Sequence, residues 1–241
     1  MTEGVHAAGA GRVSDSTVVR ELWVQSLGLV QYARALEMQR EIARQRVAGT
    51  LEQDVLLLLE HPPVVTMGRS AKENHLLASA ELLAARGVER FEVERGGDVT
   101  FHGPGQLVGY PIVDLKRHKR DLHWYLRQVE EALIRALAVV DIPAERNPGY
   151  TGVWTKGRKI ASIGVHARDW VTWHGFALNV STDLSYFDLM VPCGIQSVTM
   201  TSVDKEIGTG VAPLEQISGL VARSFAEVFE LDPRDVVASP V

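Results

Sequence analysis

The sequence contains one cysteine, Cys193, among its 241 residues. No disulfide can form within the chain, which favours a reducing compartment and leaves this thiol free for chemistry. Long apolar runs are also missing, because stretches such as Val55 to Leu59 are far below the roughly 20 residues needed to cross a bilayer. No basic segment precedes an apolar core near residue 1. We therefore expect a soluble, cytoplasmic protein that neither is exported nor enters a membrane.

Positive charge is not in excess either. Lys and Arg total 25 against 30 Asp and Glu, and the formal net charge of -5 speaks against a surface that binds nucleic acid. The eight histidines form no His-Glu-x-x-His pattern, and a single cysteine excludes a thiolate cluster, so we expect no metal site. The phosphate-binding pattern Gly-x-x-x-x-Gly-Lys-Ser/Thr is absent as well. We expect no cofactor.

The length and the 46% content of hydrophobic residues are sufficient for a sizeable core, and we expect one domain over residues 18–231. Residues 1–17 are rich in small and polar side chains without periodicity, which predicts a disordered tail. Residues 232–241 are expected to form a short C-terminal tail.

Hydrophobic periodicity predicts both helices and strands, in groups without a regular strand-helix alternation. Amphipathic helices are expected over residues 29–47, 80–85, 121–139 and 213–229, with Asp121 capping the third. Strands are expected over residues 19–24, 55–59, 64–67, 91–93, 107–115, 152–155, 159–165 and 174–180, the last two joined as a hairpin through Arg168-Asp169-Trp170. This pattern favours an α+β fold with a mixed, largely antiparallel central sheet flanked by helices.

The most unusual segment is Arg95 to Gln106, with four glycines and one proline. We expect it to be neither helix nor strand. Paired glycines let a backbone approach a ligand closely, and Arg95 and His102 would add a fixed cation and a titratable imidazole. The alternative is a tight turn whose polar residues cap its own amides.

Three blocks of the sequence are distinctive when taken together. The first is Arg95-Gly96-Gly97, Thr100 and His102-Gly103-Pro104-Gly105-Gln106, followed by Tyr110-Pro111. The second runs from Gly157 to Val165, and the third is Pro192-Cys193-Gly194-Ile195. In this order they resemble the signature of the lipoyl(octanoyl) transferases, in the biotin/lipoate protein ligase superfamily, and the similarity extends from about Leu22 to Phe229.

The resemblance implies an acyltransferase without a cofactor. Such an enzyme takes octanoyl from octanoyl-acyl carrier protein onto Cys193 as a thioester, with Lys159 assisting. It then passes the group to a lysine of the lipoyl domains of 2-oxoacid dehydrogenase subunits or of the glycine-cleavage H protein. The substrate-binding residues that the resemblance implies are Arg95, Gly96, Gly97, Asp98, Val99, Thr100, Phe101, His102, Ser162, Ile163, Gly164, Gly175, Phe176 and Ala177.

Elementary chemistry supports the pairing of Cys193 with Lys159. A free thiol with a pKa of about 8.5 is mostly protonated at neutral pH, so a nucleophilic cysteine needs a nearby cation. Lys159 on a strand and Cys193 on a loop over its end would provide this. The alternatives are an inert buried thiol and a solvated lysine, although Pro192 and Gly194 favour a constrained loop. His102 either lines the pocket or bonds to its own loop.

Small residues at Ser162, Gly164, Gly175 and Ala177 predict a slot for the acyl chain between adjacent strands, with close strand packing as the alternative. Other functions also stay open. An ATP-dependent lipoate or biotin ligase shares the fold, a non-catalytic module could bind acyl groups or lipoyl domains, and a thioesterase would pass the acyl group to water. Finally, the basic run Lys116 to Arg120, together with Arg69, is a hypothetical steering surface for an acidic carrier protein.

Overall fold

The computed structural model describes residues 20–195 and 198–236. The tail expected over residues 1–17 lies outside this part of the chain. The expected C-terminal tail is partly corrected, because Asp232–Asp235 forms strand β10, which pairs in parallel with β1. The sheet therefore extends past residue 231, and four residues that sequence alone assigned to a tail form one of its edges.

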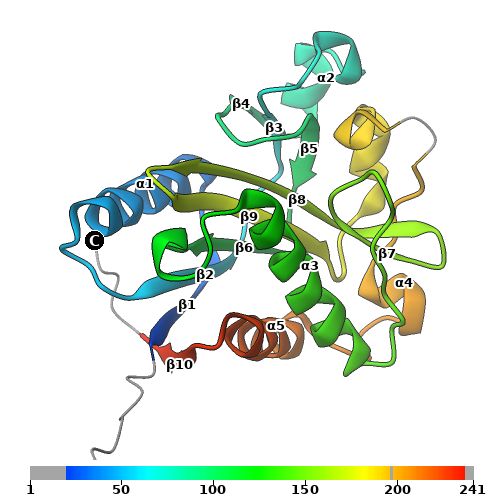
Figure 1. Ribbon diagram of the computed structural model, residues 1–241. Helices are drawn as coiled ribbons and strands as arrows, with labels where there is room; N and C mark the ends of the chain where they lie inside the picture. Colours follow the sequence, from blue (N-terminus) through cyan, green and yellow to red (C-terminus); the bar gives the residue numbers. More distant parts are fainter. Residues whose placement is uncertain (1–19, 196–197, 237–241) are drawn as a thin grey trace, which may run out of the picture.

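Seven strands form the larger sheet, in the spatial order β10, β1, β2, β6, β9, β8 and β7 (Figure 1). The pairs β10–β1 and β1–β2 are parallel, and the other four pairs are antiparallel. This confirms the mixed, largely antiparallel sheet that the sequence predicts. The bounds are β1 Glu21–Leu29, β2 Asp54–Glu60, β6 Gln106–Ile112, β7 Val153–Thr155, β8 Arg158–Arg168, β9 Val171–Asn179 and β10 Asp232–Asp235.

Helices cover both faces of this sheet, α1 on one side and α3 with α5 on the other (Figure 1). Burial on both faces explains why the middle of strand β2, Val55 to Leu59, is wholly apolar: Leu56 and Leu58 join the core under α3 and α5, while Leu57 and Leu59 join the core under α1. Within the described residues, no helix combines the length and apolar character needed to span a membrane. The α-helices are α1 Tyr32–Ala48, α2 Ala80–Ala85, α3 Leu122–Ala138, α4 Val203–Ile207 and α5 Leu214–Phe229.

A second, three-stranded sheet lies beyond one end of the larger one, in the order β4, β3, β5, with α2 beside it (Figure 1). Its strands are β3 Val64–Met67, β4 Glu89–Glu92 and β5 Val99–His102. Strand β5 corrects the expectation that the Gly-rich segment contains no strand. Val99 and Phe101 are nearly inaccessible to solvent and pack in a separate apolar cluster, where Phe101 stacks on Tyr186. Burial of these side chains stabilises the strand by more than the conformational freedom of the flanking glycines opposes it.

Two local predictions are confirmed. The Asp121 carboxylate accepts a hydrogen bond from the backbone N–H of Trp124 at 3.0 Å and so caps α3. Strands β8 and β9 form the expected hairpin, and the φ angles of Asp169 and Trp170, 51° and 66°, match the tight turns that suit the twist of paired strands. Short 3-10 helices connect other elements: η1 Glu73–His75, η2 Leu115–Arg117, η3 Leu184–Leu189 and η4 Pro192–Gly194.

Candidate active site

Lys159 stands near the start of β8 and is almost fully buried, with 1% of its surface exposed. Its backbone is held on both sides: its N–H donates to Thr199, and its carbonyl accepts from the N–H of Thr201. The ammonium group lies 5.0 Å from the centre of the Trp154 ring. Gly152 leaves the lysine stem its space, since a Cβ at this glycine would lie 2.9 Å from Cε of Lys159. The cation is thus fixed by a rigid strand and its neighbours.

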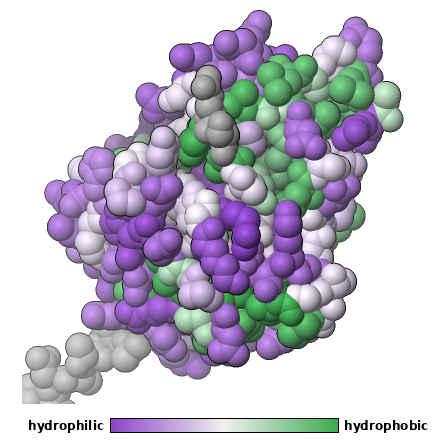
Figure 2. All heavy atoms as spheres, turned by 90° about the vertical axis from the view of Figure 1, so that its right-hand side faces the viewer, coloured by the Kyte–Doolittle hydropathy of each residue, from purple (hydrophilic) through white to green (hydrophobic). Residues whose placement is uncertain are grey.

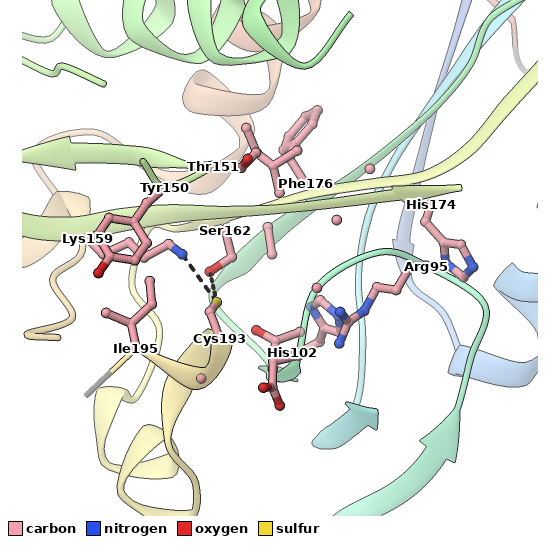
Figure 3. Close-up of a pocket in the computed structure, with 18 of the residues that line it drawn as sticks. Arg95, His102, Tyr150, Thr151, Lys159, Ser162, His174, Phe176, Cys193 and Ile195 are labelled. Atoms are coloured by element: carbon pink, nitrogen blue, oxygen red, sulfur yellow. Dashed lines mark hydrogen bonds between the residues drawn. The ribbon is translucent and has the colours of Figure 1, made fainter. Parts of the chain in front are cut away.

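Cys193 lies on the short η4 turn, 34 residues further along the chain. Its φ and ψ of 56° and 20° are left-handed, a conformation that is uncommon for a residue with a side chain. Nζ of Lys159 lies 3.2 Å from Sγ, and the Ser162 hydroxyl lies 3.6 Å from the same sulfur (Figure 3). A buried cation next to a thiol favours the thiolate form, which is the reactive one. The structure therefore brings together the predicted nucleophile, Cys193, and the predicted cation, Lys159.

A cavity of about 290 Å³ extends from this pair between the two sheets. In Figure 3, Cys193 and Lys159 lie at one end, and His102, Arg95 and His174 lie towards the other. The size is close to the roughly 300 Å³ at which small-molecule sites begin. The lining residues are Tyr32, Arg95, Gly97, Asp98, Thr100, His102, Tyr110, Gly149, Tyr150, Thr151, Lys159, Ser162, Ile163, Gly164, His174, Gly175, Phe176, Ala177, Cys193, Gly194 and Ile195.

The end remote from Cys193 is a packed group of aromatic and imidazole rings. Burial, and secondarily the neighbouring His61, lowers the pKa of His102 to about 3, and burial lowers the pKa of His61 to about 4. Burial raises the pKa of Tyr32 to about 12 and that of Tyr110 well above its ordinary value. All four side chains are therefore neutral at physiological pH, and this end can border an apolar ligand without burying a charge on any of them.

Arg95 supplies the one permanent cation of this end. Its guanidinium donates to the carbonyl and hydroxyl oxygens of Thr66 and to the carbonyl of Gly96. No carboxylate in the described part of the chain lies within ion-pair distance of it, and burial lowers the pKa of the guanidinium. Arg95 thus ties the start of the Gly-rich segment to β3 and shapes the cavity wall.

Asp98 is a carboxylate on the cavity wall, beside the turn that carries Cys193. Its Oδ1 accepts a hydrogen bond from the N–H of Val99 at 2.7 Å, and its Oδ2 lies 2.6 Å from Nδ1 of His75. A Cβ on Gly194 would stand 2.5 Å from Oδ2 of Asp98, and the φ of 67° at this position favours glycine. The carbonyl of His75 also accepts the N–H of Val191 at 2.7 Å, which anchors the same turn.

Comparison with known proteins identifies the family of this site. The model of the lipoyl protein ligase A/B catalytic domain matches residues 31–226. The chain belongs to this family. It is 51% identical over 212 residues to an octanoyltransferase of Koribacter versatilis, covering 86% of this chain and 84% of the relative. An octanoyltransferase of Rubrobacter xylanophilus is 52% identical over 203 residues, covering 83% and 90%. The chain is an acyltransferase.

Solved structures agree on the fold. A putative lipoate protein ligase from T. acidophilum with bound lipoic acid superimposes with a TM-score of 0.73 at 18% identity, covering 91% of this chain and 90% of that one. A lipoate-protein ligase A bound with ATP gives a TM-score of 0.71 at 16% identity, covering 91% and 90%. At such identities the likeness concerns the fold alone.

Most of the catalytic and substrate-binding residues that the sequence predicts line the cavity. Strand β5 separates its residues by their two-residue period: Thr100 and His102 face the cavity, while Val99 and Phe101 face the apolar cluster on the other side. Gly96 also stays outside the lining, and its N–H donates to the carbonyl of Val165. The catalytic and binding roles of the lining residues stay predictions.

The predicted slot of small residues has a mixed outcome. Ser162, Gly164, Gly175 and Ala177 all border the cavity. At Gly175, however, a Cβ would lie 2.1 Å from the carbonyl oxygen of Gly109, and at Gly164 it would lie 2.8 Å from the carbonyl oxygen of Gly96. The glycines therefore allow close approach of neighbouring backbones as well as bordering the cavity.

Sequence reasoning missed several lining residues. Tyr32 comes from the start of α1, Tyr150 and Thr151 precede β7, and His174 precedes the predicted Gly175-Phe176-Ala177 step. His174 has a φ of 56°, and its Nε2 is 3.7 Å from the nearest carboxylate oxygen, of Glu94. Only its position beside a predicted site residue could have indicated it.

The basic run Lys116 to Arg120 follows the end of β6 that is remote from Cys193. The backbone N–H of Leu115 donates a hydrogen bond to the carbonyl of Trp170 at the β8–β9 turn. The Cys193 site borders the opposite end of that hairpin. Lys116 and Lys119 pair with Asp114 and Asp121. This position and pairing give no support to a steering role.

Proposed function

We propose that this enzyme transfers an octanoyl group from octanoyl-acyl carrier protein, through a thioester on Cys193, to a lysine of a lipoyl domain. The proposal rests on one observation above all: the 3.2 Å approach of Lys159 Nζ to Cys193 Sγ at the edge of a cavity. The names of the relatives support octanoyl as the group transferred. The family description supports a lipoyl protein as the acceptor.

In the first step, the Cys193 thiolate attacks the thioester carbon of the donor. The C–S bond to Cys193 forms, the C–S bond to the carrier breaks, and the carrier thiolate takes a proton from the Lys159 ammonium. Lys159 is then neutral and able to act as a base. Its burial at 1% exposure keeps this proton transfer away from bulk water.

The acyl chain would extend from Cys193 along the cavity, past Ile163 and Phe176, towards the neutral rings of Tyr32 and His102. Burial of roughly six methylenes at about 0.8 kcal/mol each would contribute on the order of 5 kcal/mol to binding. The same apolar surface would exclude water from the thioester, which favours transfer over hydrolysis.

In the second step, the acceptor lysine attacks the thioester on Cys193. A C–N bond forms and the C–S bond breaks, which restores the thiolate, while neutral Lys159 accepts one of the protons that the acceptor lysine loses. Passing an acyl group between thiols is nearly neutral in free energy and passing it to an amine is downhill, so no ATP is needed.

The experiment is an intact-mass measurement after incubation with octanoyl-acyl carrier protein in the absence of ATP. We expect one added octanoyl group that hydroxylamine removes, no stable thioester on Cys193→Ser, and a fall in turnover of about 10³-fold or more for that variant. Addition of a lipoyl domain should move the group to its lysine.

Other outcomes would identify other functions. A requirement for ATP and free acid would indicate a ligase, and free octanoate as the main product would indicate a thioesterase. Binding of the acyl donor without any covalent adduct would indicate a non-catalytic module. An adduct on a residue other than Cys193 would contradict the mechanism.

A further inference from the structure

The proposed transfer leaves one proton unassigned. An acceptor lysine enters as an ammonium group with three N–H bonds and leaves as an amide with one, so it loses two protons. Neutral Lys159 can take only one of them. The other needs a second acceptor near the thioester, because Cys193 returns as the thiolate, and the ammonium itself must first enter a cavity that already contains the Arg95 cation. Both requirements call for a negative charge at the Cys193 end.

Asp98 is the only acidic side chain among the described residues that line this cavity. It lies within ion-pair distance of neither Lys159 nor Arg95, and the side chain that it contacts is that of His75. Its Oδ2 is next to Gly194, the residue that follows Cys193. A cation that contacts this carboxylate is therefore held beside the turn that presents the thioester.

His75 and the backbone hold this carboxylate in one orientation. Oδ1 accepts the N–H of Val99, and Oδ2 lies 2.6 Å from Nδ1 of His75. The side chain of Asp98 is 10% exposed and that of His75 is 20% exposed, so the pair lies where the cavity meets the surface. An acceptor on another protein has to approach from such a border. Figure 2 shows that apolar and polar side chains gather in separate areas on the face that includes β7 and α4.

We propose that Asp98 binds the ammonium of the acceptor lysine and takes the second proton that it loses, with His75 as a positioning residue. This inference rests on the proposed function. First, the ammonium, paired with Asp98, gives one proton to neutral Lys159. The amine then attacks the Cys193 thioester. As the C–N bond forms and the C–S bond breaks, the nitrogen becomes acidic and its second proton passes to Asp98. Asp98 finally releases that proton to solvent, which restores the enzyme.

The test separates the two half-reactions of Asp98→Asn. Asparagine keeps the oxygen that accepts the Val99 N–H but loses the charge. We expect acylation of Cys193 by octanoyl-acyl carrier protein to stay within about 2-fold of the unaltered enzyme, whereas transfer from Cys193 to the lipoyl-domain lysine falls by roughly 10²-fold. Retained acylation also shows that the variant is folded.

Hydroxylamine serves as a second acceptor because it is a neutral nucleophile near pH 7 and brings no ammonium group. Its reaction with the acylated Asp98→Asn enzyme should equal that of the unaltered enzyme. His75→Gln, which retains a hydrogen-bond donor for Asp98, should slow transfer to lysine less than Asp98→Asn does. Asp183→Asn is the matched control: Asp183 likewise accepts a backbone N–H, from Ser185, but it does not line the cavity, and both half-reactions should be unchanged.

Three results would overturn the inference alone: equal loss in both half-reactions, unchanged transfer to lysine, or equal loss with lysine and hydroxylamine. The first and third would mean that Asp98 only shapes the Cys193 turn. Absence of any thioester on the unaltered enzyme would instead overturn the proposed function, and this inference with it.

Discussion

The two ends of the cavity are built differently. At one end, Cys193 sits on a three-residue turn with left-handed backbone angles and partial exposure. At the other, Tyr32 and His102 are buried in regular structure and bear no charge. Lys159 stands on a strand of the larger sheet and reaches the sulfur of Cys193. The comparison indicates that the proposed nucleophile lies on a turn, while the groups that define its environment are held by the sheets.

Among the changes at the cavity end that contains Cys193, replacement of Lys159 should have the largest effect on the transfer rate. Lys159→Met keeps most of the buried volume but removes the cation beside the thiolate, so we expect the transfer rate to fall by about 10³-fold. Alkylation of Cys193 at neutral pH should also slow, because the cation 3.2 Å from its sulfur is gone. Lys159→Ala should slow alkylation in the same way. Unchanged alkylation rates in both variants would mean that Lys159 does not activate Cys193.

Gly194→Ala should test whether the turn itself positions the nucleophile. The new Cβ would collide with the Asp98 carboxylate, and the φ of 67° is unfavourable for alanine, so we expect the turn to move. A displacement of about 1 Å can cost roughly 10²-fold in rate. Acylation by the donor thioester is the measurement. Gly210→Ala is the control, since Gly210 has a similar φ of 75° and no neighbour within 4 Å of a Cβ, and it should retain activity.

The cavity end that contains Tyr32 and His102 should affect how the free energy of unfolding depends on pH. The pKa of His102 in the folded protein, about 3, lies below the value of about 6.5 for an unfolded chain. Below pH 6.5 the unfolded state therefore binds the proton first, and stability falls with pH towards the folded pKa. From pH 7 to pH 5, this histidine should account for a loss of about 2 kcal/mol in the free energy of unfolding.

Urea unfolding of His102→Asn at the two pH values measures this contribution. The difference in the free energy of unfolding between pH 7 and pH 5 should shrink by about 2 kcal/mol relative to the unaltered protein. His123 is exposed on α3, so His123→Asn should leave the difference unchanged. An equal pH dependence in His102→Asn and the unaltered protein would mean that His102 is protonated in the folded state.

The smallest effect on the transfer rate is expected from the basic run Lys116 to Arg120, which lies outside the cavity. Reversal of Lys116, Arg117 and Lys119 to Glu should change the rate with octanoyl-acyl carrier protein by about 2-fold or less, because this run lies far from Cys193 and its lysines pair with acidic neighbours. A small octanoyl thioester without the carrier is the control donor. Selective loss with the carrier-bound donor, together with sensitivity to salt, would restore the steering hypothesis.

The sequence by itself determined the features that depend on neighbours along the chain. The apolar stripe of α3 and its Asp121 cap, the β8–β9 hairpin, and the apolar centre of β2 all follow from local periodicity and turn chemistry. The three motif blocks and their order predicted the family, and the comparisons with known proteins confirm it. Those blocks also contain both Lys159 and Cys193, although their spacing alone says nothing about contact.

Only the tertiary structure decided what depends on residues distant in sequence. It turned Val99–His102 into a strand, because long-range burial of Phe101 outweighs the local preference of a Gly-rich segment. It brought Tyr32 from α1 and Tyr150 from a loop to one cavity, and it set Asp98 against Gly194. Such contacts arise from the packing of whole elements, and packing depends on shape and volume across the entire domain, which no short window of sequence contains.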